Sequence, residues 1–244
     1  MTTVPPRRTV TVLAVLLCAW SPVRADSADD WQFSVTPYLW AAGVAGNVGA
    51  DGTQAPPIES DYNFFSLANL DAAAFLGFSA GKGRWTLNAD YIRIGFSDDF
   101  DLGPLNTGIS LDADALELSA GYRLADWENT QLVFGTRGIS IDAGISFTPG
   151  PDSADSRTWW DPIVGVQHRR SFGEHWGLLL RGDIGGFNVS SKITFNGVVA
   201  GTYRFNDLVS VLFGYRYLTF DFRDDDFVTD LEVYGYAIGL RLSW

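Results

Sequence analysis

The last eleven residues of this 244-residue chain most constrain what it can fold into. In an extended strand, successive side chains point to opposite faces. One face of residues 234–244 then carries large apolar groups with aromatic rings toward both ends, namely Tyr234, Tyr236, Ile238, Leu240, Leu242 and Trp244. The other face carries small and polar residues, namely Gly235, Ala237, Gly239, Arg241 and Ser243. This pattern is typical of a strand that faces lipid and encloses a polar interior. The last strand of a soluble sandwich is the alternative.

The N-terminal residues predict a cleaved secretory signal peptide. Two arginines precede a largely apolar run at residues 9–20, which is too short to span a bilayer as a helix. The cleavage site is expected after Ala25, because Val23-Arg24-Ala25 places small residues at the two cleavage positions, 23 and 25. We therefore expect a signal peptide at residues 1–25 and a mature domain at residues 26–244.

Removal of the signal peptide changes both the cysteine content and the charge. Cys18 is the only cysteine, so the mature chain can form no disulfide, although export would permit one. Leu17 is larger than the residue that precedes a lipidated cysteine, which argues against lipidation. The net charge moves from −12 to −15, because three arginines and no acidic residue are removed. A nucleic-acid partner is therefore not expected.

The mature sequence predicts one all-β domain. It has no run of eighteen apolar residues and little helical periodicity, whereas short alternating runs separated by Gly, Asn and Asp recur. We expect a closed antiparallel transmembrane β-barrel of ten strands, with eight or twelve strands as alternatives. The expected strands span residues 32–44, 72–81, 84–95, 109–123, 131–145, 158–170, 176–187, 192–205, 208–220 and 231–244.

The connections between these strands alternate in length. Short turns are expected at residues 81–84, 125–129, 172–175 and 204–207. Longer or more variable loops are expected near residues 45–70, 96–108, 146–157, 188–192 and 221–230. Periplasmic turns of outer-membrane barrels are short and outer loops are longer. Both termini are therefore predicted to lie on the periplasmic side.

Four of the expected strands agree on an apolar outside and a polar inside. The outward residues are Trp85, Leu87, Ala89, Tyr91, Leu116, Leu118, Ala120, Tyr122, Phe195, Gly197, Val199, Gly201, Tyr203, Val211, Phe213, Tyr215 and Tyr217. Tyrosine and tryptophan toward the strand ends suit the headgroup level of a bilayer. Residues 138–142 fit worst, and we expect a bulge there or a departure from the membrane.

Ionisable residues on the inward faces form the candidate lumen charge network. They are Asp90, Glu117, Arg137, Asp161, Arg169, Arg181, Asp183 and Arg216. Charges inside a narrow barrel are costly unless they are paired and hydrogen-bonded, so we expect Arg–carboxylate pairs. Such pairs could fill the interior structurally, or they could line a narrow path that selects solutes.

Catalysis and metal binding have weaker support. A protease of the omptin type resembles the chain in strand number, but it needs a His–Asp pair at the outer mouth. His168 and His175 are instead expected near the periplasmic turns. Oxygen ligands for a hard cation occur at Asp224, Asp225 and Asp226, without the spacing of an EF-hand loop. We expect no enzyme activity and no cofactor, with solvated acidic loop tips as the simpler interpretation.

Several short motifs resemble a group of uncharacterised proteobacterial outer-membrane β-barrel proteins, of the same broad type as the small OmpA-like barrels. They lie at residues 37–40, 160–165, 181–187 and 214–218, and the resemblance spans residues 31–244. It implies the fold and a bacterial outer-membrane location, and no substrate. The aromatic C-terminus resembles a membrane insertion signal formed by Tyr236, Ile238, Leu240, Leu242 and Trp244.

The sequence therefore predicts an integral outer-membrane β-barrel protein that is a narrow porin-like channel or a structural membrane protein. Its expected partners are outer-membrane lipid, lipopolysaccharide and the barrel assembly machinery, and the protein is expected to be a monomer. An outer-membrane enzyme acting on lipid or peptide is one alternative. A soluble periplasmic lipocalin-like binder is another, and there the largest apolar residues should face inward.

Overall fold

The computed structural model describes residues 30–49, 58–60, 70–101, 106–127, 129–148, 153–224 and 227–244. Its strands are β1 (Gln32–Gly49), β2 (Ile58–Ser60), β3 (Leu70–Lys82), β4 (Trp85–Asp101), β5 (Asn106–Arg123), β6 (Thr130–Thr148), β7 (Ser153–Phe172), β8 (Trp176–Gly185), β9 (Ser191–Arg204), β10 (Val209–Asp224) and β11 (Phe227–Ser243). The described residues contain no helix long and apolar enough to span a membrane. The predicted signal peptide at residues 1–25 lies outside the described residues and stays a prediction.

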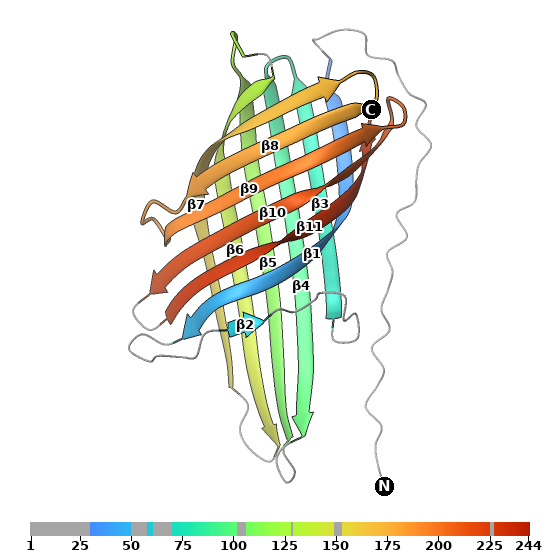
Figure 1. Ribbon diagram of the computed structural model, residues 1–244. Helices are drawn as coiled ribbons and strands as arrows, with labels where there is room; N and C mark the ends of the chain where they lie inside the picture. Colours follow the sequence, from blue (N-terminus) through green and yellow to red (C-terminus); the bar gives the residue numbers. More distant parts are fainter. Residues whose placement is uncertain are drawn as a thin grey trace.

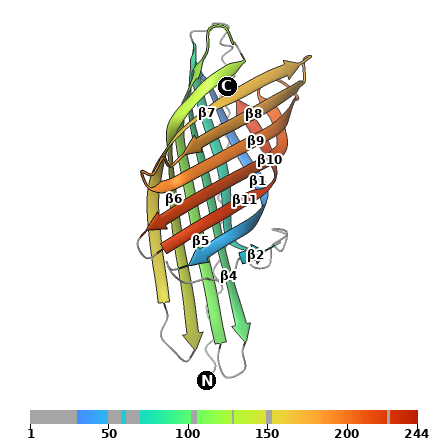
Figure 2. The same ribbon diagram turned by 60° about the vertical axis from the view of Figure 1, so that its left-hand side comes forward.

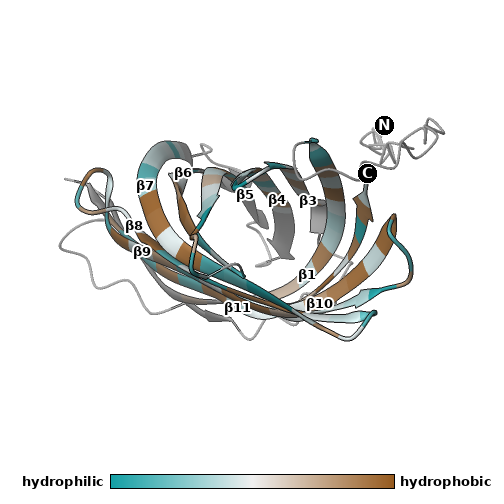
Figure 3. Ribbon diagram, turned by 90° about the horizontal axis from the view of Figure 1, so that it is seen from above, coloured by the Kyte–Doolittle hydropathy of each residue, from teal (hydrophilic) through white to brown (hydrophobic). Residues whose placement is uncertain are grey.

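Ten of these strands close into a barrel. Each pairs antiparallel with its neighbour along the chain, and β11 returns to pair with β1 from Ser34 opposite Ser243 to Gly49 opposite Val228. The short strand β2 is extra, because it adds to β1 at residues 44–46. Seen along its axis, the barrel is a flattened ring (Figure 3). The predicted closed antiparallel barrel of ten strands is confirmed.

The two ends of the barrel differ. The end that carries both chain termini of the barrel and the turns after β3, β5, β7 and β9 is called the terminal end. At the opposite, far end, β4, β5 and β6 project well past β8 and β9 (Figures 1 and 2). This rim is uneven because β6 has 19 residues and β8 has only 10.

The expectation of longer loops at the far end is wrong for three connections. Only residues 102–105, 149–152 and 225–226 separate the strands there, so these connections are as short as the turns of the terminal end. The strands themselves continue through residues that the sequence had assigned to loops. Among these, β7 begins at Ser153 rather than near residue 158.

Side chains alternate across the barrel wall as the sequence predicted. The outward residues Leu87, Leu118, Val199 and Phe213 are 44–56% exposed, and the exposed side chains Phe134, Val164, Leu180 and Ile238 continue the same surface around the barrel. We call these eight residues the outer belt. A soluble lipocalin-like barrel would turn its largest apolar side chains inward instead.

The segment at residues 138–142 contains no bulge. Strand β6 pairs with both neighbours in a register that does not shift anywhere along this segment. Ile139 is buried, and Ile141 packs partly buried against the same interior cluster. The segment fitted the expected alternation poorly because its large apolar side chains, Ile139 and Ile141, point into the barrel. From the sequence, large apolar side chains were expected to face outward.

Candidate functional site

A charge-balanced cluster crosses the lumen of the barrel. Arg137 on β6 is 1% exposed and its Nη2 donates to Glu117 Oε2 at 2.7 Å and to Asp183 Oδ1 at 2.6 Å. Arg181 on β8 pairs with the same two carboxylates, through its Nη2 to Glu117 and its Nε to Asp183 at 3.0 Å. Two guanidinium groups therefore share two carboxylates, and the opposite charges of this buried group balance one another.

The cluster continues to the opposite wall through an amide. Asn196 Nδ2 donates to Asp183 Oδ2 at 2.8 Å, and Asn196 Oδ1 accepts from Arg216 Nε at 3.0 Å. Arg216 Nη1 then lies 2.7 Å from Asp90 Oδ2, and Tyr38 OH donates to Asp90 Oδ1 at 2.8 Å. Three arginines and three carboxylates from five strands form this ionic layer, which consists of Asp90, Glu117, Arg137, Arg181, Asp183 and Arg216 together with Asn196 and Tyr38.

Two of the predicted network residues lie apart from the ionic layer. Asp161 on β7 is fully buried and accepts hydrogen bonds from Ser191 N at 2.8 Å and Ser191 Oγ at 2.6 Å. It therefore holds the start of β9 and pairs with no arginine in the described part of the chain. Arg169 lies nearer the terminal end and makes no ion pair with any described carboxylate.

Asp161 supports a tight turn at the end of β8. Gly186 has φ +86° and is followed by Phe187 and Asn188 at φ 50° and 58°, all in the left-handed region. That conformation is unfavourable for phenylalanine, so the surrounding contacts must hold it in place. Gly186 N donates to Pro162 O at 3.1 Å, which ties the turn to β7 beside Asp161.

Replacing Asp161 with alanine should therefore destabilise the barrel by about 1–3 kcal/mol, because the buried N–H of Ser191 loses its acceptor. The measurement is urea unfolding of the refolded protein in detergent. Replacing Ser190 with alanine is the control, since its Oγ makes a single exposed bond to Trp160 O at 2.9 Å. Equal losses in the two variants would contradict the role given to Asp161.

An apolar layer fills the lumen on the far side of the ionic layer. Its buried members come from six strands and are Trp40, Ala42, Phe75, Ile92, Ile139, Trp159, Leu218, Phe220 and Phe222. Trp159 and Phe222 stack with ring centroids 4.4 Å apart. The Arg216 guanidinium lies 5.3 Å from the Trp40 ring, which joins the two layers through a cation–π contact.

Sequence reasoning missed this apolar layer. The signal was present, because Leu218, Phe220 and Phe222 share the parity of Arg216 along β10. The inward faces were expected to be polar, and no second, apolar zone of the interior was expected.

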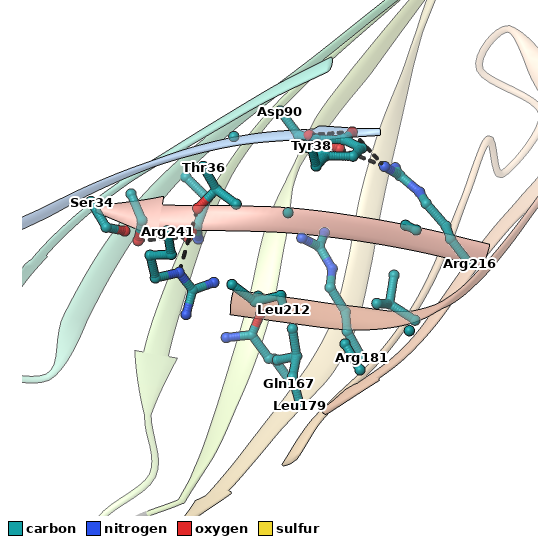
Figure 4. A pocket seen from close by; sticks show the side chains of 18 of the residues that line it. Ser34, Thr36, Tyr38, Asp90, Gln167, Leu179, Arg181, Leu212, Arg216 and Arg241 are labelled. Atoms are coloured by element: carbon teal, nitrogen blue, oxygen red, sulfur yellow. Dashed lines mark hydrogen bonds and ion pairs between the residues drawn. The ribbon is translucent and has the colours of Figure 1, made fainter. Parts of the chain in front are cut away.

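On the terminal side of the ionic layer lies a cavity of about 200 Å³. Figure 4 shows Arg181, Arg216 and Arg241 pointing toward it, with Ser34, Thr36 and Gln167 on its walls. Arg169 also lines it. We call this space the vestibule. Its lining combines arginine and other polar side chains with apolar ones such as Leu179 and Leu212, and the ionic layer forms its floor.

The described residues give no support to a metal centre or to the omptin-type site. No group of three or more histidine, cysteine or acidic side chains in the described part of the chain could hold a metal ion. Asp225 and Asp226 lie outside the described residues, and the side chain of Asp224 is not described. His168 bonds Thr130 Oγ1 at 3.0 Å and His175 bonds Arg204 O at 2.9 Å, both at the terminal end.

The residues of the predicted insertion signal lie on the outside of β11. Tyr236, Ile238, Leu240 and Trp244 are 42–74% exposed. The Trp244 ring stacks on Phe33 at a centroid distance of 6.1 Å, beside the backbone bonds that join the two ends of the chain in the barrel. These positions leave the aromatic C-terminal side chain at the outer surface of the terminal end.

Comparison with known proteins identifies the class of fold. The outer-membrane protease OmpT from Escherichia coli matches with a TM-score of 0.50 at 8% identity, covering 88% of this chain and 97% of that chain. Ail, the attachment invasion locus protein of Yersinia pestis, matches with a TM-score of 0.46 at 11% identity, covering 88% and 99%. No family model matches the sequence, and no curated protein sequence matches it. The chain has the fold of an outer-membrane β-barrel.

Proposed function

We propose that the protein is an integral protein of the bacterial outer membrane whose lumen is closed, so that it serves as a structural membrane protein rather than as an open pore or an enzyme. The observation that carries this proposal is the stacking of the ionic layer and the apolar layer across the lumen. The outer belt supports the membrane location, since an exposed apolar surface around a whole barrel is costly in water.

The two layers oppose the passage of an ion through their chemistry as well as through steric blocking of the lumen. An ion that entered from the vestibule would first meet guanidinium and carboxylate groups that already satisfy each other. It would then have to lose its water among Trp40, Trp159 and Leu218, of which Leu218 is 2% exposed. Desolvating an ion in such a zone is strongly unfavourable. The terminal end, which carries both chain termini of the barrel, faces the periplasm in this proposal.

The experiment is planar-bilayer conductance of the mature protein refolded in lipid, with folding checked by a heat-dependent gel shift. The expected result is a silent bilayer. Fractionation of cells should place the protein with the outer membrane. Discrete, reproducible current steps from folded protein would overturn the closed lumen, and recovery in the soluble periplasmic fraction would overturn the location.

A narrow channel is the second candidate, and the vestibule favours it because this cavity reaches the ionic layer from the terminal end. A channel would conduct only if the ionic layer rearranged. Its current steps should then change when Arg216 is replaced by alanine, since this residue joins the ionic layer to the apolar layer. Steps that are unchanged in this variant would contradict a path through the lumen.

A further inference from the structure

The inward arginines divide into two groups. Arg137, Arg181 and Arg216 each contact a carboxylate at 3.0 Å or less. Arg169 and Arg241 form no ion pair with any carboxylate in the described ranges. Arg241 Nε has a single long bond, to Thr36 Oγ1 at 3.4 Å. With the Gln167 amide in its favoured orientation, the Gln167 side-chain oxygen accepts from Arg169 Nε at 3.2 Å and Nη2 at 3.3 Å. Neither arginine is therefore neutralised by a described carboxylate.

The two unpaired arginines meet in the vestibule. Both line the same cavity, together with Arg181, so positive side chains from β7, β8 and β11 border one small space. Like charges held close together in a partly buried space repel one another. A bound anion would relieve this repulsion, whereas water alone would relieve it only in part.

The balance of charge in the vestibule is opposite to that of the chain. Its lining includes the arginines at positions 169, 181, 216 and 241 and a single acidic residue, Asp90, which Arg216 already holds at 2.7 Å. The chain as a whole carries a net charge of −12. Positive charge is thus concentrated here in a strongly acidic protein, and a cavity with walls of low polarizability focuses the resulting field.

We propose that the vestibule is a binding site for a small oxyanion, a phosphate or a carboxylate, held between Arg169 and Arg241 above the ionic layer. Guanidinium groups donate two parallel hydrogen bonds to such oxygens. Ser34, Thr36 and Gln167 line the same cavity and add uncharged polar groups. The volume of about 200 Å³ limits the bound part of the ligand to a small group.

The test is calorimetric titration of inorganic phosphate into the refolded protein, in a detergent that carries no phosphate or carboxylate. The wild type should show saturable binding that weakens as sodium chloride is raised. The variants Arg169→Gln and Arg241→Gln should each bind at least about tenfold more weakly, which corresponds to about 1.4 kcal/mol.

Arg170→Gln is the matched control, because it removes the same charge from the next residue on β7. The Arg170 side chain is exposed and its guanidinium lies 5.5 Å from the Phe172 ring. This variant should bind phosphate as the wild type does. An equal loss in all three variants would overturn the site, since it would show a general effect of net charge.

The titration of the wild type tests the proposal even where a variant does not fold. Absence of saturable binding of both inorganic phosphate and acetate to the folded wild type would overturn the proposal. Parallel titrations with acetate and glycerol phosphate separate a free carboxylate, a free phosphate and a lipid headgroup as the source of the oxyanion. All of these measurements are made in detergent, so a conducting barrel would not by itself affect them.

Discussion

Replacing Arg137 with alanine should lower the free energy of unfolding by about 3–5 kcal/mol, because it leaves two buried carboxylates with less compensation. Arg137 is 1% exposed, and its Nη2 lies 2.7 Å from Glu117 and 2.6 Å from Asp183. Of the arginines in the described ranges, Arg181 would still pair with both acids. The measurement is urea unfolding in detergent micelles, followed by tryptophan fluorescence.

Arg93→Ala is the control for this prediction. Arg93 pairs with Asp112 at 3.9 Å and Asp114 at 3.7 Å, but its side chain is 47% exposed. Exposed pairs of this kind contribute little to stability, because water and salt screen them. The two variants remove the same charge, so a similar loss in both would contradict the argument from burial.

The double variant Glu117→Gln and Arg137→Met separates burial of charge from loss of volume. It removes one acid and one base, and it leaves Asp183 paired with Arg181 at 3.0 Å. The double variant should therefore be more stable than Arg137→Ala alone, because no unpaired carboxylate remains. If it were the less stable of the two, unpaired charge could not explain the effect of Arg137→Ala.

The number of strands and the direction of the faces could be predicted because both depend on local alternation. Leu118 and Glu117 are neighbours in the chain, and a strand must place them on opposite sides of the wall. In the structure Leu118 is 44% exposed and Glu117 is 4% exposed. The strand ends were harder to predict from the sequence, because a strand that projects beyond a barrel can carry the same polar residues as a loop.

Partners across the lumen could not be predicted, because they depend on how ten strands are staggered. Asp161 and Asp183 are both inward acids on neighbouring strands, and nothing in their local sequence separates their roles. Asp161 lies directly opposite Arg137 in the register of β6 and β7, yet the Arg137 guanidinium donates to Glu117 and Asp183. Asp161 accepts its hydrogen bonds from Ser191 at the start of β9, although an arginine is its neighbour across the strands.

Replacing Trp159 with alanine should lower the free energy of unfolding by about 3–5 kcal/mol, because it opens a cavity in the apolar layer. Trp159 is 5% exposed and stacks on Phe222 at a centroid distance of 4.4 Å. No acceptor in the described part of the chain lies within hydrogen-bond distance of Trp159 Nε1. Trp159→Phe should therefore cost much less, since it keeps a stacked ring and loses no hydrogen bond.

The next residue provides the matched control, since Trp160→Ala makes the same substitution on the opposite face of β7. Trp160 is 44% exposed on the outside of the barrel, where detergent or lipid can occupy the space that the ring leaves. A larger loss at Trp159 than at Trp160 would mean that packing inside the lumen stabilises this barrel more than its contacts with the surrounding apolar phase. Equal losses, or a larger one at Trp160, would show that the apolar layer is loosely packed, and the closed lumen would then have to depend on the ionic layer alone.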